Sequence, residues 1–201
     1  MMQTVWNDNL VLLRGRVAEP PRPSHENHGV RYLVFPLEVQ RLSGASDLLN
    51  IVASDTLLAR FPVSPGLPLE VTGEVRSYNN KTGQGSRLVI TVYARELSFR
   101  DAPHENLVVL TGTLCKPPTL RRTPLGRDIC DLMLAVNRRY GRADYLPCIS
   151  WGALARQCGD LQVGEQIRLK GRLQSRTYTK QLPGGTEQRT AFEISVMELD
   201  D

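Results

Sequence analysis

The stretch from Leu134 to Trp151 combines aromatic rings with arginines, two kinds of side chain that act on a nucleic-acid strand. Its eighteen residues, LAVNRRYGRADYLPCISW, include three aromatic residues and three arginines. Arginines neutralise phosphates, and an exposed ring gives an unpaired base a flat surface for stacking, worth roughly 1 to 3 kcal/mol per base. This composition suits a single strand of nucleic acid. The alternative is a polar hairpin whose rings are half-buried by packing.

The composition of the chain is that of a folded, mildly basic protein. Hydrophobic residues make up 41% and charged residues 23% of the 201 positions, which is too apolar for general disorder. The net charge of +4 and the pI near 9.0 favour a polyanionic partner without demanding one. No run of eighteen apolar residues occurs, and the N-terminus lacks the regions of a signal peptide. We therefore expect a cytoplasmic, nucleoid-associated protein with no membrane partner.

Residues for catalysis or metal binding are few and poorly spaced. The four cysteines form no Cys-x-x-Cys pair, so we interpret them as small buried hydrophobes rather than metal ligands or disulfide partners. His25 and His28 form a His-x-x-His pair without a third ligand of fitting spacing, which favours a polar loop. No phosphate-cradling glycine loop and no Gly-x-Ser-x-Gly motif occurs. The sequence predicts no enzymatic activity, no cofactor and no metal.

A repeat in the chain shows which elements position the aromatic stretch. Residues 8–21 match residues 105–118 at a shift of 97 (105 minus 8), and one inserted residue later moves the register to 98. Identical pairs along these registers are Gly29 with Gly126, Arg41 with Arg138, Asp47 with Asp144, Gly73 with Gly171 and Ser77 with Ser175. A fixed offset of this kind indicates a repeated domain. The sequence predicts two tandem domains, 1–101 and 102–201, joined near Arg100 to His104.

Each domain has the pattern of an all-β fold. In the second, strands are expected at 106–114, 129–137, 145–151, 167–178 and 189–197, with a short helix at 152–158. The first has apolar residues at the matching strand positions: Leu10, Leu12, Phe35, Leu37, Val39, Leu69, Val71, Ile90 and Val92. Five strands with a helix between the third and fourth is the order of an OB-fold. The expected fold class is all-β, with two tandem OB-folds, each a five-stranded Greek-key barrel with one short helix.

Six segments of the second domain occur in an order and at a spacing that are typical of one family. They read NLVVLTGTL (106–114), RRTPLG (121–126), LAVNR (134–138), YLPCISWGALA (145–155), VGEQIRLKGRL (163–173) and RTAFEISV (189–196). No single segment is specific, whereas the ordered set covers most of residues 105–197. It resembles the bacterial single-stranded DNA-binding protein family, here in a tandem form with two OB-folds.

The resemblance implies four base-stacking positions: the end of the second strand, both ends of the third and the end of the fourth. All four are aromatic here, as Tyr140, Tyr145, Trp151 and Tyr178. For Trp151, which precedes the helix, partial burial in the core is the alternative. Basic residues on loops or strand ends beside this face are expected to contact phosphates, with a solvated basic face as the alternative for any one. They are Arg121, Arg122, Arg138, Arg139, Arg142, Arg172, Arg176 and Lys180.

The first domain lacks this set of rings. The same four positions, carried back through the repeat, are Ser43, Leu48, Ser54 and Asn80. Tyr32 and Tyr78 lie at positions that do not match and would replace the rings only in part. We therefore expect the first OB-fold to bind single-stranded DNA weakly or not at all, and to serve mainly in building the oligomer or engaging a partner.

The resemblance also implies an assembly and partners. Family members with one OB-fold per chain usually form homotetramers, so this chain is expected to present four OB-folds as a homodimer. Most members have a flexible tail with an acidic tip that recruits replication and repair enzymes, whereas this sequence runs from the last strand directly into 197–201. Recruitment of replication or repair proteins is expected to be absent or to use another surface, such as the first OB-fold.

Two functions of different kinds are consistent with these observations. The first is sequence-independent binding and protection of single-stranded DNA in replication, repair or recombination, by base stacking and phosphate contacts. The second is a protein-interaction module akin to primosomal OB-fold proteins, in which nucleic-acid contact is secondary. Retained rings in the second domain favour the first function. RNA is a further possible ligand, because stacking and phosphate contacts hardly distinguish the sugars.

Overall fold

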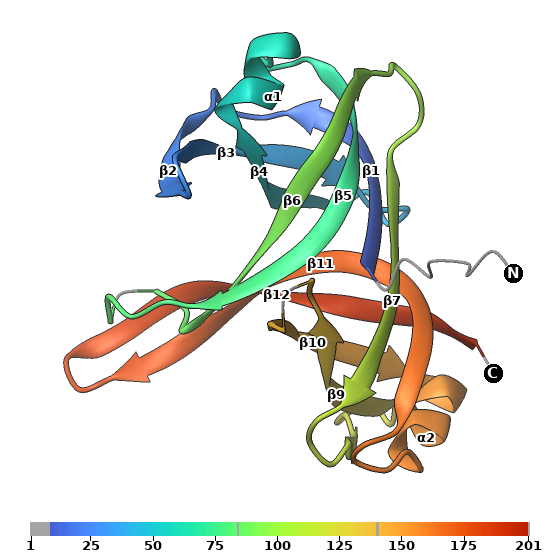
Figure 1. The fold of residues 1–201 in the computed structure, drawn as a ribbon. Helices are drawn as coiled ribbons and strands as arrows, with labels where there is room; N and C mark the ends of the chain where they lie inside the picture. The colour runs from blue at the N-terminus through green and yellow to red at the C-terminus, as the bar shows by residue number, and fades with distance from the viewer. Residues whose placement is uncertain (1–8, 84, 140, 201) are drawn as a thin grey trace, which may run out of the picture.

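The computed structural model describes residues 9–83, 85–139 and 141–200, and it confirms two tandem OB-folds (Figure 1). The strands of the first barrel are β1 (Asn9–Val17), β2 (Arg22–Asn27), β3 (Val30–Gln40), β4 (Ser46–Ser54), β5 (Pro68–Asn79) and β6 (Leu88–Phe99). Those of the second are β7 (Glu105–Leu114), β8 (Thr119–Arg122), β9 (Asp128–Asn137), β10 (Ala143–Trp151), β11 (Gln166–Leu182) and β12 (Gly185–Asp200). The helices are α1 (Asp55–Arg60) and α2 (Gly152–Gly159). Within the described residues, no helix has the length and apolar character to span a bilayer.

Each barrel closes through the same set of strand pairings. In the first, β1 pairs antiparallel with β3 and β5, β3 with β4, and β5 with β6, while β4 meets β6 in parallel. The second barrel repeats this scheme with β7, β9, β10, β11 and β12. The helix precedes the fourth barrel strand in both, as the OB-fold order requires.

Each barrel has one short strand more than the five expected. β2 pairs with β3, and β8 pairs with β9. All side chains of β2 and β8 are exposed, so neither strand shows the alternation that marks a half-buried strand in sequence. His28 and Gly29 both have positive φ, 50° and 74°, which fits the tight turn of a two-residue hairpin. The expected polar loop at His25 to His28 is therefore wrong: this segment is a strand and its turn.

The β11–β12 hairpin is longer than expected. Its pairing continues without a break from Gly171 with Val196 to Leu182 with Gly185, and in Figure 1 it projects well beyond the second barrel. We expected the first strand to end at 178 and the second to begin at 189, because the polar residues between these positions suggested a loop. Two of these residues, Thr179 and Thr186, are threonines, which favour extended pairing despite their polarity.

The barrel interior follows the expected alternation on β9. Cys130, Leu132, Leu134 and Val136 of β9 are all buried, as predicted. On β1, however, Val11 and Leu13 are fully buried, whereas Leu10 is 38% exposed. The apolar run at 10–13 has no polar residue to mark the outer face, so its sequence did not fix which residues point inward.

Two glycines of the repeat occupy a close approach between strands. Gly73 lies at a register shift between β5 and β6, and Gly171 lies at the equivalent shift between β11 and β12. A Cβ atom would lie 2.0 Å from the Tyr93 carbonyl oxygen at Gly73 and 2.5 Å from the Ser195 carbonyl oxygen at Gly171. Only glycine fits there, which explains why this repeat pair is identical.

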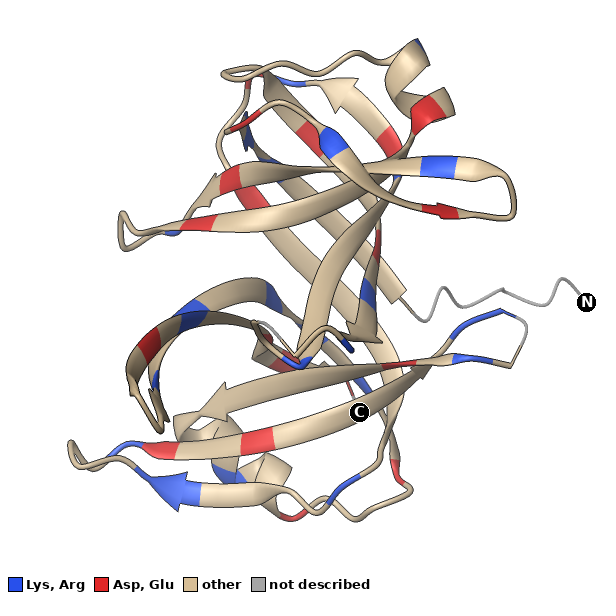
Figure 2. Cartoon of the chain, turned by 90° about the vertical axis from the view of Figure 1, so that its left-hand side faces the viewer, with Lys and Arg blue, Asp and Glu red and all other residues tan. Residues whose placement is uncertain are grey.

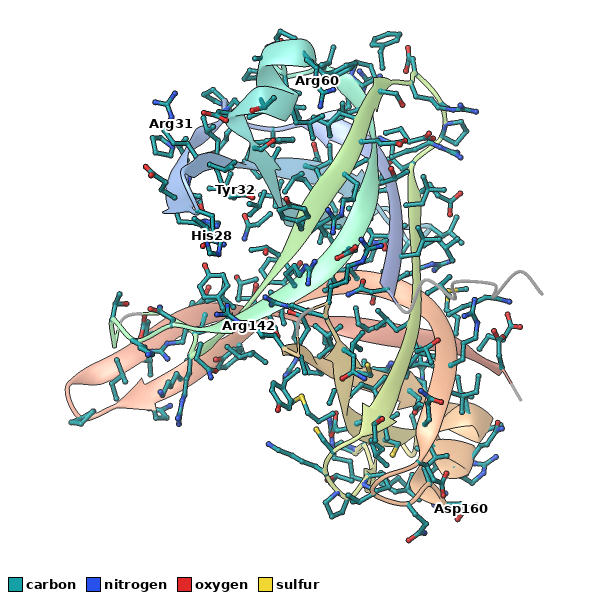
Figure 3. The ribbon with its side chains drawn as sticks, viewed as in Figure 1. His28, Arg31, Tyr32, Arg60, Arg142 and Asp160 are labelled. Atoms are coloured by element: carbon teal, nitrogen blue, oxygen red, sulfur yellow. The ribbon has the colours of Figure 1, made fainter. Side chains whose placement is uncertain are left out.

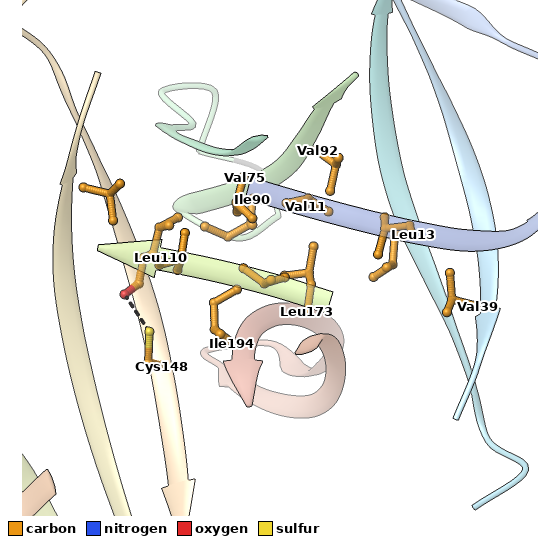
Figure 4. Close-up of a cluster of buried hydrophobic side chains, with 14 of the residues drawn as sticks. Val11, Leu13, Val39, Val75, Ile90, Val92, Leu110, Cys148, Leu173 and Ile194 are labelled. Atoms are coloured by element: carbon orange, nitrogen blue, oxygen red, sulfur yellow. Dashed lines mark hydrogen bonds between the residues drawn. The ribbon is translucent and has the colours of Figure 1, made fainter. Parts of the chain in front are cut away.

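The two barrels share a sheet and a core. β1 pairs antiparallel with β7, from Asn9 with Leu110 to Arg14 with Glu105. This joins all the strands into one twelve-stranded sheet with β1 and β7 at its centre. Figure 4 shows buried side chains of both barrels meeting across the two strands, with Val11, Val75 and Ile90 on one side and Leu110, Leu173 and Ile194 on the other. The domains are therefore packed as a single body.

Candidate nucleic-acid interface

The outer face of β10 presents two of the predicted stacking rings. Tyr145 is 51% exposed and Trp151 is 44% exposed, whereas Leu146, Cys148 and Ser150 between them are buried. Period-two alternation therefore puts both rings on one face, and six residues of strand separate them by roughly 20 Å. Trp151 is partly buried, as the alternative allowed, and 44% of its surface stays open to a base.

The other two predicted rings differ in how far the structure describes them. Tyr178 is half-buried on β11, and the Arg176 guanidinium carbon lies 5.8 Å from its ring centroid. This distance allows a cation–π interaction. Tyr140 lies outside the described residues.

A pocket next to Trp151 adds arginines that sequence reasoning missed. It is lined by Trp151, Gly126, Gly152, Asp128 and three arginines, Arg122, Arg127 and Arg156. Arg122 and Arg156 both pair with Asp128, at 3.0 Å and 2.5 Å. Arg127 and Arg156 were not predicted, although Arg156 stands one and a half turns along the helix that begins after Trp151. Three cations around one carboxylate leave a net positive pocket beside an exposed ring.

The predicted phosphate-contacting residues fall into two groups. Arg121 pairs with Asp131 at 2.7 Å, and Arg176 lies 3.7 Å from Glu193. In contrast, the structure gives no hydrogen bond or ion pair to the side chains of Arg139, Arg142, Arg172 and Lys180 among the residues it describes. Figure 2 shows Lys and Arg positions interspersed with Asp and Glu positions along the strands of both barrels.

Arg172 lies apart from the rings. It lines a pocket between the two barrels, together with Arg41, Asp47, His104 and Gln174. The Nδ1 atom of His104 accepts a hydrogen bond from the Gln40 backbone N–H at 2.7 Å, which fixes the connection between the domains at this pocket. The structure thus brings Arg172 to the domain junction rather than to the outer face of β10.

Glu193 is a half-buried acidic residue of β12 beside Arg176. Burial raises the pKa of its carboxyl, an effect that the nearby guanidinium of Arg176 only partly offsets. The outer positions of β12 therefore include a carboxyl that is reluctant to ionise.

Arg138 contacts protein rather than solvent. Its guanidinium donates to Asp144, with Nε at 2.6 Å from Oδ2, and to the Ser77 carbonyl oxygen of the first barrel at 2.9 Å. Asp144 is fully buried and also accepts from the Ser77 backbone N–H at 2.6 Å. Ser77, on β5, is thereby tied to β10 across the domain junction. We call this set the Asp144 lock.

The repeat produces a twin of this arrangement on the other side of the junction. Arg41 donates to Asp47 and to the Ser175 carbonyl oxygen, the latter at 2.8 Å, and Ser175 donates to Asp47 through its backbone N–H at 2.8 Å. Every member is the repeat partner of a residue in the Asp144 lock. We call this set the Asp47 lock. The two locks, and the barrels that they join, are therefore related by an approximate two-fold axis.

The Asp144 lock reaches the stacking surface directly. The Tyr145 backbone N–H donates to the Ser77 hydroxyl oxygen at 2.8 Å. A side chain of the first barrel thus holds the backbone of a predicted stacking residue in the second barrel.

The first-barrel residues at the four stacking positions have other surroundings. The Ser54 hydroxyl accepts from the Leu57 backbone N–H at 3.1 Å and caps α1, whereas Trp151 provides no side-chain cap for α2. Such a cap contributes about 1 kcal/mol, so a ring at this position replaces a stabilising contact. Leu48 is 49% exposed and Ser43 is exposed. Asn80 accepts from Thr82 within its loop.

The cysteines agree with the interpretation as small hydrophobes. Cys130, Cys148 and Cys158 are buried and Cys115 is half-buried, and all four are free thiols. Burial raises the pKa of Cys130 to about 11, and it raises the pKa values of Cys148 and Cys158 as well.

Comparison with known proteins identifies the family of the second barrel. Residues 105–200 match the model of the single-strand binding protein family. Single-stranded DNA-binding protein A of Bacillus subtilis is 39% identical over 83 residues, covering 38% of this chain and 48% of that protein. The single-stranded DNA-binding protein of Clostridium tetani is 38% identical over 80 residues, covering 36% of this chain and 55% of that protein. The chain thus spans about half the length of the curated relatives it matches.

A solved structure matches both barrels together. The wild-type single-stranded DNA binding protein from Thermus aquaticus superimposes with a TM-score of 0.77 and 21% identity, covering 96% of this chain and 91% of that chain. At this identity the match establishes the shared fold. The family match therefore applies to the second barrel, residues 105–200, and the shared fold extends over both barrels.

Proposed function

We propose that this protein binds single-stranded DNA without sequence preference, mainly through the outer face of the second barrel. The observation that carries the proposal is the pair of exposed rings, Tyr145 and Trp151, on one face of β10, with a pocket of arginines beside Trp151. Rings at this separation can hold separate bases of one strand, because every base has an apolar face whatever its identity. The names of the sequence relatives support the same ligand.

The basic residues take different roles in this proposal. Arg139, Arg142 and Lys180 neutralise phosphates, since their side chains carry no ion pair in the described structure. Arg121, Arg122 and Arg176 exchange their carboxylate partners for phosphate, and Arg127 and Arg156 join them at the Trp151 pocket. Tyr178 and Tyr140 provide further stacking positions. Arg138 acts indirectly, by holding Asp144 and Ser77 in place below Tyr145.

The first barrel supports the second in this proposal. Its Ser77 fixes the backbone at Tyr145, and β1 completes the central sheet with β7. We propose further that the chain forms a homodimer that presents four OB-folds. The outward side of the central strands has an apolar patch that fits this assembly, made of the cross-strand pairs Leu10 with Val109 and Leu12 with Leu107, of which Leu10 is exposed and Val109 is buried. This patch lies on the approximate two-fold axis, where a second copy would pack symmetrically.

A titration that reads Trp151 alone tests the proposed function. The chain has two tryptophans, so Trp6→Phe leaves Trp151 as the reporter. We expect oligo-dT to quench its fluorescence and the affinity to fall steeply with salt, as phosphate contacts require. Oligo-rU in the same assay measures the preference for DNA over RNA.

The matched variant is Trp151→Ser, which installs the residue found at the corresponding first-barrel position. Serine at the first-barrel position caps α1, and we expect the same cap on α2 to offset the packing lost with the half-buried ring, so that the variant folds with nearly unchanged thermal stability. Its affinity for oligo-dT, followed by anisotropy of a labelled strand, is expected to fall about tenfold or more. An unquenched Trp151 with no binding even at low salt would refute the proposed function.

A further inference from the structure

The outer face of the first barrel has an aromatic and cationic cluster of its own. His25 on β2 stacks on Tyr32 of β3, with ring centroids 4.8 Å apart and planes inclined by 12°. Tyr32 in turn contacts Tyr93 of β6, at 5.8 Å between centroids and 3.4 Å between hydroxyl oxygens. Three strands thus bring three rings into one continuous row. The core side of the same strands is formed by Phe35, Val92 and other buried residues, so the row faces outward.

Arginines surround the inner end of this row. The Arg95 guanidinium carbon lies 4.9 Å from the Tyr93 ring centroid and that of Arg76 lies 5.7 Å from it. Both arginines pair with Glu74, which fixes them over the ring. Two guanidinium groups against one carboxylate leave a net positive charge beside Tyr93. Arg31, 75% exposed on β3 next to Tyr32, adds a further cation, paired with Asp55.

The outer end of the row is open. His25 is an exposed residue, and Tyr32 stacks on one face of its ring. Figure 3 shows Tyr32 and His28 on the side of the β2–β3 hairpin that points toward the long hairpin of the second barrel. A planar apolar group can therefore extend the stack on the other face of the imidazole.

The cluster does not follow the pattern of the second barrel. By the repeat, His25, Tyr32 and Tyr93 correspond to Arg122, Ile129 and Ser195, none of which is aromatic. The first barrel thus lacks rings at the four positions carried back from the second and has rings at three others on the same outer face. Packing within the β2–β3 hairpin does not by itself explain the row of rings, because Arg95 and Tyr93 belong to β6.

The domain junction connects the two aromatic surfaces. Tyr78, 55% exposed on β5, follows Ser77, whose hydroxyl holds the Tyr145 backbone. An outward ring of the first barrel therefore lies beside the point where the stacking surface of the second barrel begins. A strand that leaves Tyr145 has a short route over Tyr78 to Tyr93 and His25.

We propose that His25, Tyr32 and Tyr93, with Arg76 and Arg95, form a second stacking site for the same DNA strand, relocated within the first barrel. This revises the expectation that the first OB-fold binds DNA weakly or not at all, and it rests on the proposed function of the second barrel. Short strands occupy the Trp151 surface alone. Longer strands cross the junction and stack on His25 as well.

The test compares two strand lengths on the full chain, a dT strand of about 10 nucleotides and one of about 35, chosen around the site size of single OB-folds. Removing the stack with His25→Ala plus Tyr32→Ala is expected to lower the affinity for the long strand about tenfold or more, and to leave short-strand quenching of Trp151 unchanged. Tyr32→Phe keeps the ring and is expected to bind as the parent does. Phe99→Ala is the matched control, since it removes an exposed ring from the far end of β6.

A direct reporter covers the case in which the double variant folds poorly. Tyr32→Trp in a Trp6→Phe, Trp151→Phe background places a fluorophore in the row. We expect the long strand to quench it and the short strand to leave it unchanged. Long-strand affinity within about twofold of the parent in the double variant, or a Tyr32→Trp reporter that stays bright at saturation, overturns the inference. Failure of the proposed function has a different signature, which is loss of short-strand quenching at Trp151.

Discussion

Asp144→Asn is the substitution that tests how the first barrel supports the second. Asp144 is fully buried and accepts from Arg138, the Ser77 backbone N–H and, at 3.4 Å, Arg76. Asparagine has the same shape, but its amide donors would face these donors and its neutral oxygen would leave Arg138 without a counter-charge. Removing one partner of a buried ion pair costs about 3 to 5 kcal/mol.

The expected loss lies at the lower end of this range because Arg138 is 26% exposed and water can reach part of it. We expect the free energy of unfolding to fall by about 3 kcal/mol, which for a chain of this size is a fall of about 6 to 12 °C in Tm. Circular dichroism melts measure it. Arg138→Met added to Asp144→Asn should recover part of the loss, since both charges are then gone.

The effect on DNA binding separates positioning from stability. Asp144→Asn loosens Ser77 and with it the hydrogen bond that holds the Tyr145 backbone, so we expect the affinity for oligo-dT to fall about fivefold at a temperature where the variant is folded. Asp47→Asn is the matched control. It breaks the twin lock, which has no bond to Tyr145, and should cost similar stability with little change in short-strand affinity. Equal losses of affinity in the two variants, or a stability loss below about 1 kcal/mol, would refute the reasoning.

Three further outcomes follow from the titratable groups. Burial alone would raise the pKa of Asp47, but hydrogen bonds from Arg41 and Ser175 outweigh it and hold that pKa below its ordinary value. The stability that this group contributes is present above its unfolded pKa of about 4 and is lost as the pH falls through its folded pKa. The Tm of Asp47→Asn should therefore fall less steeply with decreasing pH than the Tm of the parent protein. Cys115 alone should react with a thiol reagent at pH 8 in the native protein, whereas a second thiol of comparable rate would contradict the burial of the other three. Glu193→Gln should bind oligo-dT about two- to fivefold more tightly near neutral pH, because it removes a carboxylate that competes with phosphate for Arg176; unchanged affinity would exclude Glu193 from the DNA-binding surface.

Much of the fold was predictable because the alternation of apolar residues and the internal repeat both depend on which residues fill the barrel interior. β9, β10 and α2 lie within two residues of their predicted ends, and the buried side of β9 is the predicted one. β2 and β8 were missed because all their side chains are exposed and pairing with a neighbour, not burial, makes them strands. The full length of the β11–β12 hairpin was missed for the same reason, since its polar tip has the composition of a loop.

The candidate site was predictable in its rings but less so in its charges. Tyr145 and Trp151 are exposed on one strand face because alternation and the buried residues between them leave no other side. A guanidinium, in contrast, pairs with whichever carboxylate the fold brings near. Arg138 and Asp144 are six residues apart in the chain, but their contact with Ser77 comes from β5 of the other barrel. Arg127 and Arg156 join Trp151 only once the β8–β9 turn and α2 lie beside it.

The residues that the two domain copies share and the residues that differ between them make different kinds of contact. Asn9 and Asn106 each bond the backbone of the fourth barrel strand of their own barrel, and the Asp47 and Asp144 locks bridge the barrels. These shared residues hold the assembly, and each must be present twice because the junction is nearly symmetric. The residues that differ, such as Ser54 against Trp151 and Tyr93 against Ser195, lie on the outer faces. The two barrels therefore share a nearly symmetric junction and differ in the side chains of their outer faces.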